Sequence, residues 1–109
     1  MSLPVELSGR AKGDMVRNAV WWADHHSVLA AIEWEEVVTR QLKQIGFAPE
    51  SYPFFQTTVD YPVQMREALV GKGRRKYRAV FRTEDARILI VRIFSGEQGE
   101  STTELELEI

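Results

Sequence analysis

The spacing of apolar residues changes once along this chain of 109 residues, and that change constrains the fold more than any other feature. Up to Ile45, apolar side chains recur at intervals of three and four, which is the period of an amphipathic helix. Beyond Val63 they alternate or run continuously, as they do in strands. Residues 47–62 between the two parts hold three of the four prolines and exclude a long regular element. We therefore expect a helical part followed by a sheet.

The helical part divides into two helices. The first is predicted from residue 9 to about residue 24, with Ser8 as its N-cap. Its buried face is expected to carry Ala11, Met15, Ala19 and Trp22, widened by Val16, Val20 and Ala23. Trp21 lies off this face, at a rim or in an interface.

The second helix is predicted over residues 28–45. Either Asp24 or Ser27 can act as its N-cap, and Gly46 takes the C′ position that ends a helix. Its apolar stripe consists of Ala31, Trp34, Val38, Leu42 and Ile45. Because only a few residues separate the two helices, they are expected to form an antiparallel hairpin.

The strands are predicted before and after the helices. They cover residues 3–7, 63–70, 77–83 and 87–95. The first, with its early proline, fits an edge strand, and the last two form a hairpin through residues 84–86. Residues 88–91 are apolar without interruption, as in a strand buried on both faces. The order β-α-α-β-β-β predicts an α+β fold in which a helical hairpin packs on a small antiparallel sheet.

Length and composition fit one domain. We expect it to span residues 1–109, with a core at about residues 4–96 and an acidic C-terminal extension at 97–109. The alternating residues 103–109 are either a final strand or a frayed tail. The chain has no cysteine, no apolar run long enough to cross a membrane and no signal-peptide pattern in residues 1–25. These features favour a cytoplasmic protein without a membrane partner.

Charge is distributed unevenly along the sequence. All fourteen basic residues precede residue 97, whereas the last thirteen residues carry five acids and no base. Seven bases and one acid lie between Arg66 and Arg82. Such a stretch suits an anionic partner, although it also suits a solvated strand protected by charge against edge pairing.

Motifs for catalysis or metal binding are not found in the sequence. His25 and His26 are adjacent and cannot jointly chelate on a regular element, and we expect neither a metal site nor a cofactor. Glu33, Glu35 and Glu36 are interpreted as a solvated helix face. The segment 71–74, Gly-Lys-Gly-Arg, is interpreted as a flexible basic turn, since no helix N-terminus follows it to complete a phosphate loop.

The basic turn and the strand after it provide the candidate contact residues. Alternation places Arg74, Lys76 and Arg78 on one face and Arg75 and Tyr77 on the other. Arginine and lysine beside a tyrosine can hold a polyanion or meet an acidic protein surface. The predicted contact residues are Arg66, Lys72, Arg74, Arg75, Lys76, Tyr77 and Arg78.

Three segments in order resemble the RelE/ParE superfamily of type II toxins from bacterial toxin–antitoxin systems, the plasmid stabilisation proteins, over about residues 4–96. Residues 7–15, Leu-Ser-Gly-Arg-Ala-Lys-Gly-Asp-Met, are similar to the start of the first family helix. Residues 77–82, Tyr-Arg-Ala-Val-Phe-Arg, are similar to the family's central strand. Residues 88–96, Ile-Leu-Ile-Val-Arg-Ile-Phe-Ser-Gly, are similar to its closing strand, with Ser95 where many relatives have histidine.

The resemblance implies one of two activities. RelE-like members are ribosome-dependent mRNA endonucleases, and ParE-like members bind and inhibit DNA gyrase without chemistry of their own. The strand arginine of the endonucleases matches Arg78, with Lys76 beside it as a second candidate catalytic residue. Their late basic position falls on Glu97 or Gln98, and the region of their C-terminal tyrosine falls near Glu104. Acidic residues there would repel an RNA backbone, which favours the ParE-like branch.

The partners implied by the ParE-like resemblance are DNA gyrase and a cognate antitoxin. The antitoxin is expected to lay a helix and an extended segment across the helical hairpin and the sheet. The alternatives are an endonuclease that acts on the ribosome and mRNA, and a homologue that binds antitoxin without being toxic. A homo-oligomer and a toxin–antitoxin hetero-oligomer both remain open.

Overall fold

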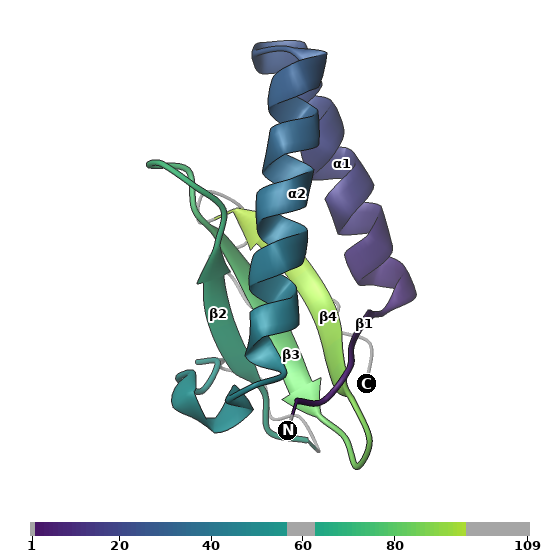
Figure 1. The fold of residues 1–109 in the computed structure, drawn as a ribbon, viewed down its shortest axis with the longest axis vertical. Helices are drawn as coiled ribbons and strands as arrows, with labels where there is room; N and C mark the ends of the chain where they lie inside the picture. Colours follow the sequence, from purple (N-terminus) through teal and green to yellow (C-terminus); the bar gives the residue numbers. More distant parts are fainter. Residues whose placement is uncertain (1, 57–62, 96–109) are drawn as a thin grey trace.

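The two helices lie on one face of a twisted sheet in the computed structural model, which describes residues 2–56 and 63–95 (Figure 1). Its elements follow the predicted order and the predicted α+β class. They are β1 (Val5–Leu7), α1 (Gly9–His25), α2 (Val28–Ile45), a 3₁₀ turn (Pro49–Ser51), β2 (Arg66–Val70), β3 (Tyr77–Thr83) and β4 (Ile88–Ser95). The predicted extension at 97–109, with its possible strand at 103–109, lies outside the described residues.

The strand order is β1-β4-β3-β2, and the sheet is mixed where the sequence predicted an antiparallel one. β2 pairs antiparallel with β3, and β3 with β4, but β1 runs parallel to β4. The helical hairpin explains this difference, because it returns the chain to the end of the sheet where β1 begins (Figure 1). β2 therefore runs in the direction of β1, and two reversals later β4 does so too. The expected edge position of the first strand is confirmed.

Both helices begin at the serines that the sequence indicated. The Oγ of Ser8 accepts a hydrogen bond from the Ala11 N–H at 3.1 Å, and the Oγ of Ser27 accepts one from the Ala30 N–H at 3.0 Å. Ser27, and not Asp24, is therefore the second N-cap. The predicted stripe of α2 is confirmed, since its buried residues are Ala31, Trp34, Val38, Leu42 and Ile45.

The buried face of α1 differs from the predicted one. Met15, Ala19 and Trp22 pack against the core only in part, and Val16 and Val20 are 64% and 52% exposed. Ala11 is buried as predicted, but the other buried positions are the polar residues Asp14 and Asn18. Two polar side chains are therefore turned inward, toward the edge of the sheet.

The edge of β4 beyond Ile90 explains these buried polar side chains. β1 pairs with residues 88–90 only, so the backbone of β4 after Ile90 has no neighbouring strand there. The Ser8 Oγ donates to the Val91 carbonyl at 3.0 Å, and the Asn18 amide donates to the Ile93 carbonyl at 3.4 Å. The Asp14 carboxylate accepts from the Ile93 N–H at 2.8 Å. The N-cap serine and two side chains of α1 thus supply the partners that buried backbone groups require.

Both faces of the sheet bury apolar side chains. The larger core lies between the sheet and the helices and includes Trp34, Tyr77, Phe81 and Ile90. The smaller one comprises Phe55, Met65, Val80, Leu89, Val91 and Phe94. Because neighbouring strand residues alternate between these sets, the sets lie on opposite faces. The prediction that residues 88–91 are buried on both faces is confirmed.

Gly46 has a different role from the predicted one. Its φ of −63° is right-handed, so it is not the left-handed C′ glycine that ends many helices. The backbone of Leu3 passes against it, and the Leu3 N–H donates to the Gly46 carbonyl at 2.9 Å. A Cβ on residue 46 would lie 2.1 Å from the Leu3 carbonyl oxygen. Glycine is required because the N-terminal segment lies so close.

The loop and the later strands follow the prediction in part. β3 has the predicted bounds, the Glu84 N–H closes the hairpin onto the Arg87 carbonyl at 2.8 Å, and β2 begins only at Arg66. The loop aromatic Phe55 is buried and Tyr52 packs edge-on against Phe81, but Phe47 is 70% exposed. No helix in the described part of the chain is long and apolar enough to cross a membrane.

Candidate binding surface

The basic segment between β2 and β3 is a tight turn held by two glycines. Gly71 and Gly73 have φ angles of +101° and +70°, a region that side-chain-bearing residues rarely adopt. Residues 71–76 lie outside the strands, because β3 begins at Tyr77. The predicted alternation of residues 74–78 over two faces therefore applies only to Tyr77 and Arg78.

Side chains of α2 hold this turn in place on one side through hydrogen bonds and an ion pair. The Gly71 N–H donates to the Gln41 Oε1 at 2.6 Å, and the Gln41 Nε2 donates back to the Gly71 carbonyl at 3.2 Å. The Lys76 Nζ donates to that same carbonyl at 3.0 Å. The Lys72 Nζ lies 3.3 Å from the Glu33 carboxylate, in an exposed ion pair. The turn therefore has a defined position against α2.

Helix α1 fastens the turn from another side through aromatic rings. The Arg75 guanidinium lies 3.8 Å from the centre of the Trp21 ring, whose centre is 4.1 Å from that of the stacked His25 ring. The Tyr77 hydroxyl accepts hydrogen bonds from the Trp22 Nε1 and the Arg75 Nε, both at 3.0 Å. The Arg75 head group is thus held by both α1 and β3. A cation stacked on an aromatic face gains about 0.5–2 kcal/mol.

The predicted contact residues differ in how accessible they are. The Tyr77 ring is completely buried and packs against Trp34, so Tyr77 supports the surface from below. Arg74 is exposed and has no ion pair or hydrogen bond within the described residues. Arg78 is also exposed, and its Nε lies 3.7 Å from the Glu67 carboxylate, which is a long and weak pair. Arg74 and Arg78 are therefore the cations best able to meet a partner.

Arg66 lies apart from the basic turn. It stands at the opposite end of β2, where it pairs with Phe81. Its Nη1 donates to the Tyr52 carbonyl at 2.6 Å, and its guanidinium lies 4.0 Å from the centre of the Phe54 ring. It borders a shallow hollow of about 220 Å³, lined also by Glu50, Gln64, Arg82 and Thr83. Its contacts fix the 3₁₀ segment against β2.

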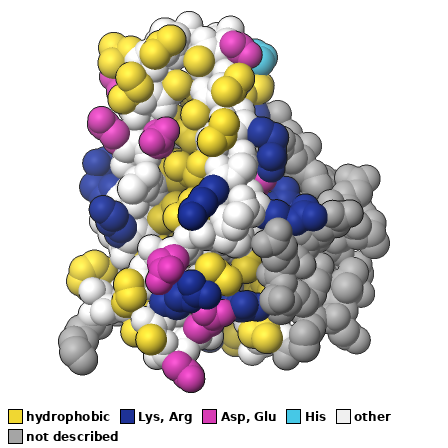
Figure 2. Space-filling model, turned by 90° about the vertical axis from the view of Figure 1, so that its right-hand side faces the viewer, with side chains coloured by type: hydrophobic (Ala, Val, Ile, Leu, Met, Phe, Trp, Pro, Cys, Tyr) yellow, Lys and Arg dark blue, Asp and Glu magenta, His cyan; other side chains and the backbone are white. Residues whose placement is uncertain are grey.

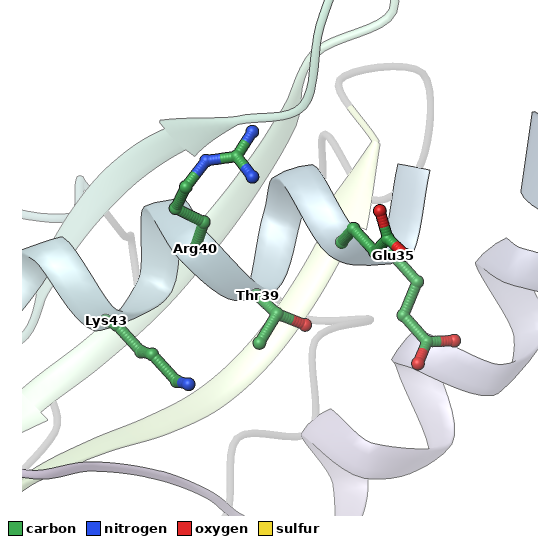
Figure 3. Close-up of a pocket in the computed structure, with 5 residues that line it drawn as sticks. Glu35, Thr39, Arg40 and Lys43 are labelled. Carbon is green, nitrogen blue, oxygen red and sulfur yellow. The ribbon is translucent and has the colours of Figure 1, made fainter. Parts of the chain in front are cut away.

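A second hollow, of about 390 Å³, lies on the outer side of α2 (Figure 3). Its lining residues are Glu35, Glu36, Thr39, Arg40 and Lys43. The acidic side chains of this lining come from the residues nearer the N-terminus of α2, and the basic ones from the residues nearer its C-terminus. Across residues 2–56 and 63–95, no group of three or more His, Asp or Glu side chains could hold a metal ion.

Exposed apolar residues gather on the helical hairpin. Figure 2 shows hydrophobic side chains grouped toward the end of the hairpin where α1 meets α2. The exposed large apolar residues of the two helices are Val16, Val20, Val28, Leu29 and Ile32. A contiguous apolar surface of this kind marks an interaction site more often than a solvated one.

A comparison with solved structures finds the same fold in a bacterial system. A chain of the structure described as "Chromosomal ParDE TA system from P. aeruginosa" superposes with a TM-score of 0.69. The alignment covers 86% of this chain and 96% of that chain, at 16% sequence identity. The fold is shared with that chain. At this identity the likeness establishes the architecture and no more. No protein-family model and no curated protein matches the sequence.

Sequence reasoning did not identify the residues that hold the turn. Gln41 and Glu33 lie on the polar side of α2, about thirty to forty positions before the turn, and nothing in their local pattern marks them. One feature of the sequence pointed to Trp21, namely its position on the first helix but off the apolar face. That position is now explained by its contact with Arg75.

Proposed function

We propose that this chain is the toxin of a type II toxin–antitoxin system and acts, in the ParE-like manner, by binding DNA gyrase. The observation that carries the proposal is the fold shared over 96% of a chain from the ParDE TA system. The three sequence segments similar to the RelE/ParE superfamily support it independently, because they were recognised from residue pattern alone. A target of this kind implies a cytoplasmic protein.

The basic turn is the proposed contact with the target. Arg74 and Arg78 offer exposed cations, and Lys72, Arg75 and Lys76 are held beside them in fixed positions. A preorganised cationic surface binds with less loss of side-chain freedom than a flexible one. Electrostatic attraction would also speed encounter with an acidic protein surface.

The helical hairpin and the outer strand are the proposed contact with the antitoxin. Val16 and Val20 are four residues apart on α1 and present an exposed apolar strip. An amphipathic helix of the antitoxin can cover such a strip. β2 is the outer strand of the sheet and carries Leu69, which is 67% exposed. The start of that edge already pairs with residues 53–55, so an extended segment of the antitoxin can pair along the rest of it.

Binding is favoured over RNA cleavage by the surroundings of the proposed catalytic residues. The Arg78 guanidinium faces the Glu67 carboxylate, and the Lys76 amine is bonded to the Gly71 carbonyl. Stabilising a cleaved phosphate requires positive charge aimed at a common point. Here the Lys76 amine is bonded to the backbone of the turn, and Arg78, although exposed, lies beside an acid that would repel a phosphate.

The deciding experiment is pulse labelling of DNA and protein synthesis after induced expression in bacteria without antitoxin. DNA synthesis is expected to stop first, and the purified protein is expected to inhibit supercoiling by gyrase. Arg74→Glu should weaken both effects at least tenfold. Lys12→Glu, which reverses an exposed charge on α1, is the matched control and should leave both effects unchanged. If protein synthesis stops first, the target is the ribosome and the proposal is wrong.

A further inference from the structure

The outward side of α2 carries a stripe of alternating chemical character. Ile32 is 50% exposed, Glu36, Thr39 and Lys43 are exposed, and Phe47 is 70% exposed. These residues follow one another at intervals of three and four, so they lie on one side of the helix. That side is opposite the buried stripe from Ala31 to Ile45.

Phe47 belongs to this stripe although it follows the helix end. Gly46 keeps a right-handed backbone conformation, with φ −63° and ψ −18°. The Gly46 and Phe47 N–H groups donate to the carbonyls of Lys43 and Gln44, at 3.2 and 3.1 Å. Both bonds span three residues, so the backbone tightens into a 3₁₀-type turn beyond Ile45, and the exposed Phe47 ring follows Lys43 at the end of the stripe.

The two charged residues of the stripe, and Arg40 beside it, have no partner in the described part of the chain. Among residues 2–56 and 63–95, Glu36, Arg40 and Lys43 take part in no ion pair or hydrogen bond of their side chains. Figure 3 shows Arg40 and Lys43 extending from the helix in different directions, with Glu35 farther along the helix. These groups are free to pair with another molecule.

The stripe is complementary to itself when it is reversed. Two α2 helices can be laid antiparallel so that the two-fold axis passes between Thr39 and Arg40. Ile32 of each copy then faces Phe47 of the other, and Glu36 of each faces Lys43 of the other. A two-fold interface requires such self-complementarity, since the same surface serves both subunits.

We propose that α2 forms the interface of a homodimer, in which the two copies pair antiparallel through this stripe. In this dimer the two Ile32–Phe47 contacts lie outside the two Glu36–Lys43 ion pairs. Arg40 lies diagonally beside the Glu36 side chain of the other copy. A shift by one helical turn would place Ile32 against Lys43 or Gln44 and lose both apolar contacts. The charge pattern thus sets the register, as it does in coiled coils. The proposal does not depend on the proposed toxin function.

The test is a charge exchange followed by sedimentation equilibrium of the full chain. Wild-type protein is expected to be a concentration-dependent dimer. Glu36→Lys and Lys43→Glu should each weaken dimerisation at least tenfold, because each puts like charges together at two symmetric places. The double variant should recover dimerisation to within about threefold of the wild type. Glu35→Lys makes the same change on the same helix beside the stripe and is the matched control.

Cysteine cross-linking provides a second measurement, because the chain contains no cysteine. Thr39→Cys places a thiol next to the proposed axis and should form a disulfide-linked dimer under mild oxidation. Lys12→Cys on α1 should not. Circular dichroism of each variant separates a lost interface from a lost fold.

Three outcomes would overturn the proposal. The first is a wild-type chain that is monomeric up to its solubility limit. The second is a dimer that tolerates both single charge reversals. The third is a Thr39→Cys variant that stays monomeric and whose thiol is shielded from thiol reagents only when antitoxin is added. That result would assign this face to the antitoxin instead.

Discussion

The Asp14 carboxylate in α1 accepts a hydrogen bond from the backbone N–H of Ile93 in β4, at 2.8 Å. The same carboxylate pairs with the Arg92 guanidinium, at 2.8 Å to its Nε, and with Arg17 at the surface. The Asp14 side chain is only 3% exposed, and that of Arg92 is 14% exposed. One buried acid thus joins the first helix to the unpaired edge of the last strand.

Replacing Asp14 by alanine should destabilise the fold strongly. Arg92 would remain as an uncompensated, largely buried charge, and the Ile93 N–H would lose its acceptor. Breaking a buried pair in this way costs about 3–5 kcal/mol. Urea denaturation measures the loss. Arg17→Ala removes the exposed partner of the same carboxylate and should cost less than about 1 kcal/mol. Equal effects of the two variants would contradict the bridging role of Asp14.

Gly46→Ala should destabilise the fold through contact with the N-terminal segment. The added Cβ would meet the Leu3 carbonyl oxygen at 2.1 Å, so the segment before β1 or the end of α2 must move. Overpacking of this kind costs about 1–3 kcal/mol. Gly9→Ala is the control, because a Cβ there meets nothing within 4 Å. Thermal denaturation should show a lower midpoint for Gly46→Ala only.

Tyr77→Phe should loosen the basic turn without removing a charge. The Trp22 Nε1 and the Arg75 Nε would both lose their common acceptor, which costs about 1–3 kcal/mol. Target binding should weaken because Arg75 loses one of the contacts that hold it in place. Tyr52→Phe is the control, since the Tyr52 hydroxyl has no hydrogen bond within the described residues. Binding that survives Tyr77→Phe unchanged would show that the position of Arg75 is unimportant.

Gln41→Leu should release the turn from α2. The variant keeps a side chain of similar size but loses both hydrogen bonds to Gly71. Amide hydrogen exchange of residues 71–76 should become faster, while that of β3 stays protected. Gln44→Leu, at an exposed position of the same helix, should leave exchange in the turn unaltered.

The turn between β3 and β4 should make stability depend on acid pH. A hydrogen bond from Arg87, aided by one from Arg82, lowers the pKa of Glu84 below its ordinary 4.5. A carboxylate with a lowered pKa contributes stability above its unfolded pKa and loses it as the pH falls through the folded pKa. Glu84→Gln should therefore be less stable than the wild type at neutral pH. The difference should shrink only below about pH 4.5. Urea denaturation of both proteins across this pH range measures the difference, and a difference that stayed constant into strong acid would contradict this role of Glu84.

Local patterns predicted an element well where several signals within it agreed. Helix α2 has the predicted bounds and buried stripe, because its apolar period, its serine cap and its core contacts all agree. Helix α1 was predicted in extent and in part of its buried face, with Ala11 buried and Met15, Ala19 and Trp22 against the core, but not in its two buried polar residues. Its Asp14 and Asn18 satisfy backbone groups of β4, seventy-five or more positions away, and a local window contains no trace of that need.

The sequence predicted which charged residues belong to the candidate site, but not how they are arranged. The sequence located the cations between Arg66 and Arg78, but it grouped Arg66 with a turn that lies at the other end of β2. It also counted Tyr77 among the contact residues, whereas its ring is buried and its hydroxyl holds Trp22 and Arg75. Which charges are free and which are paired depends on the neighbours that folding brings to them.

The sequence by itself determined the order of the elements, the cap at Ser8, and the basic turn with its two glycines. These depend on residues within a few positions of each other, where backbone preference and periodicity act directly. Only the tertiary structure decided that β1 is parallel to β4, that Asp14 is buried, and that Gly46 must lack a side chain. Each of these results from an approach between distant segments, whose sterics and unpaired hydrogen-bonding groups arise only when the segments meet.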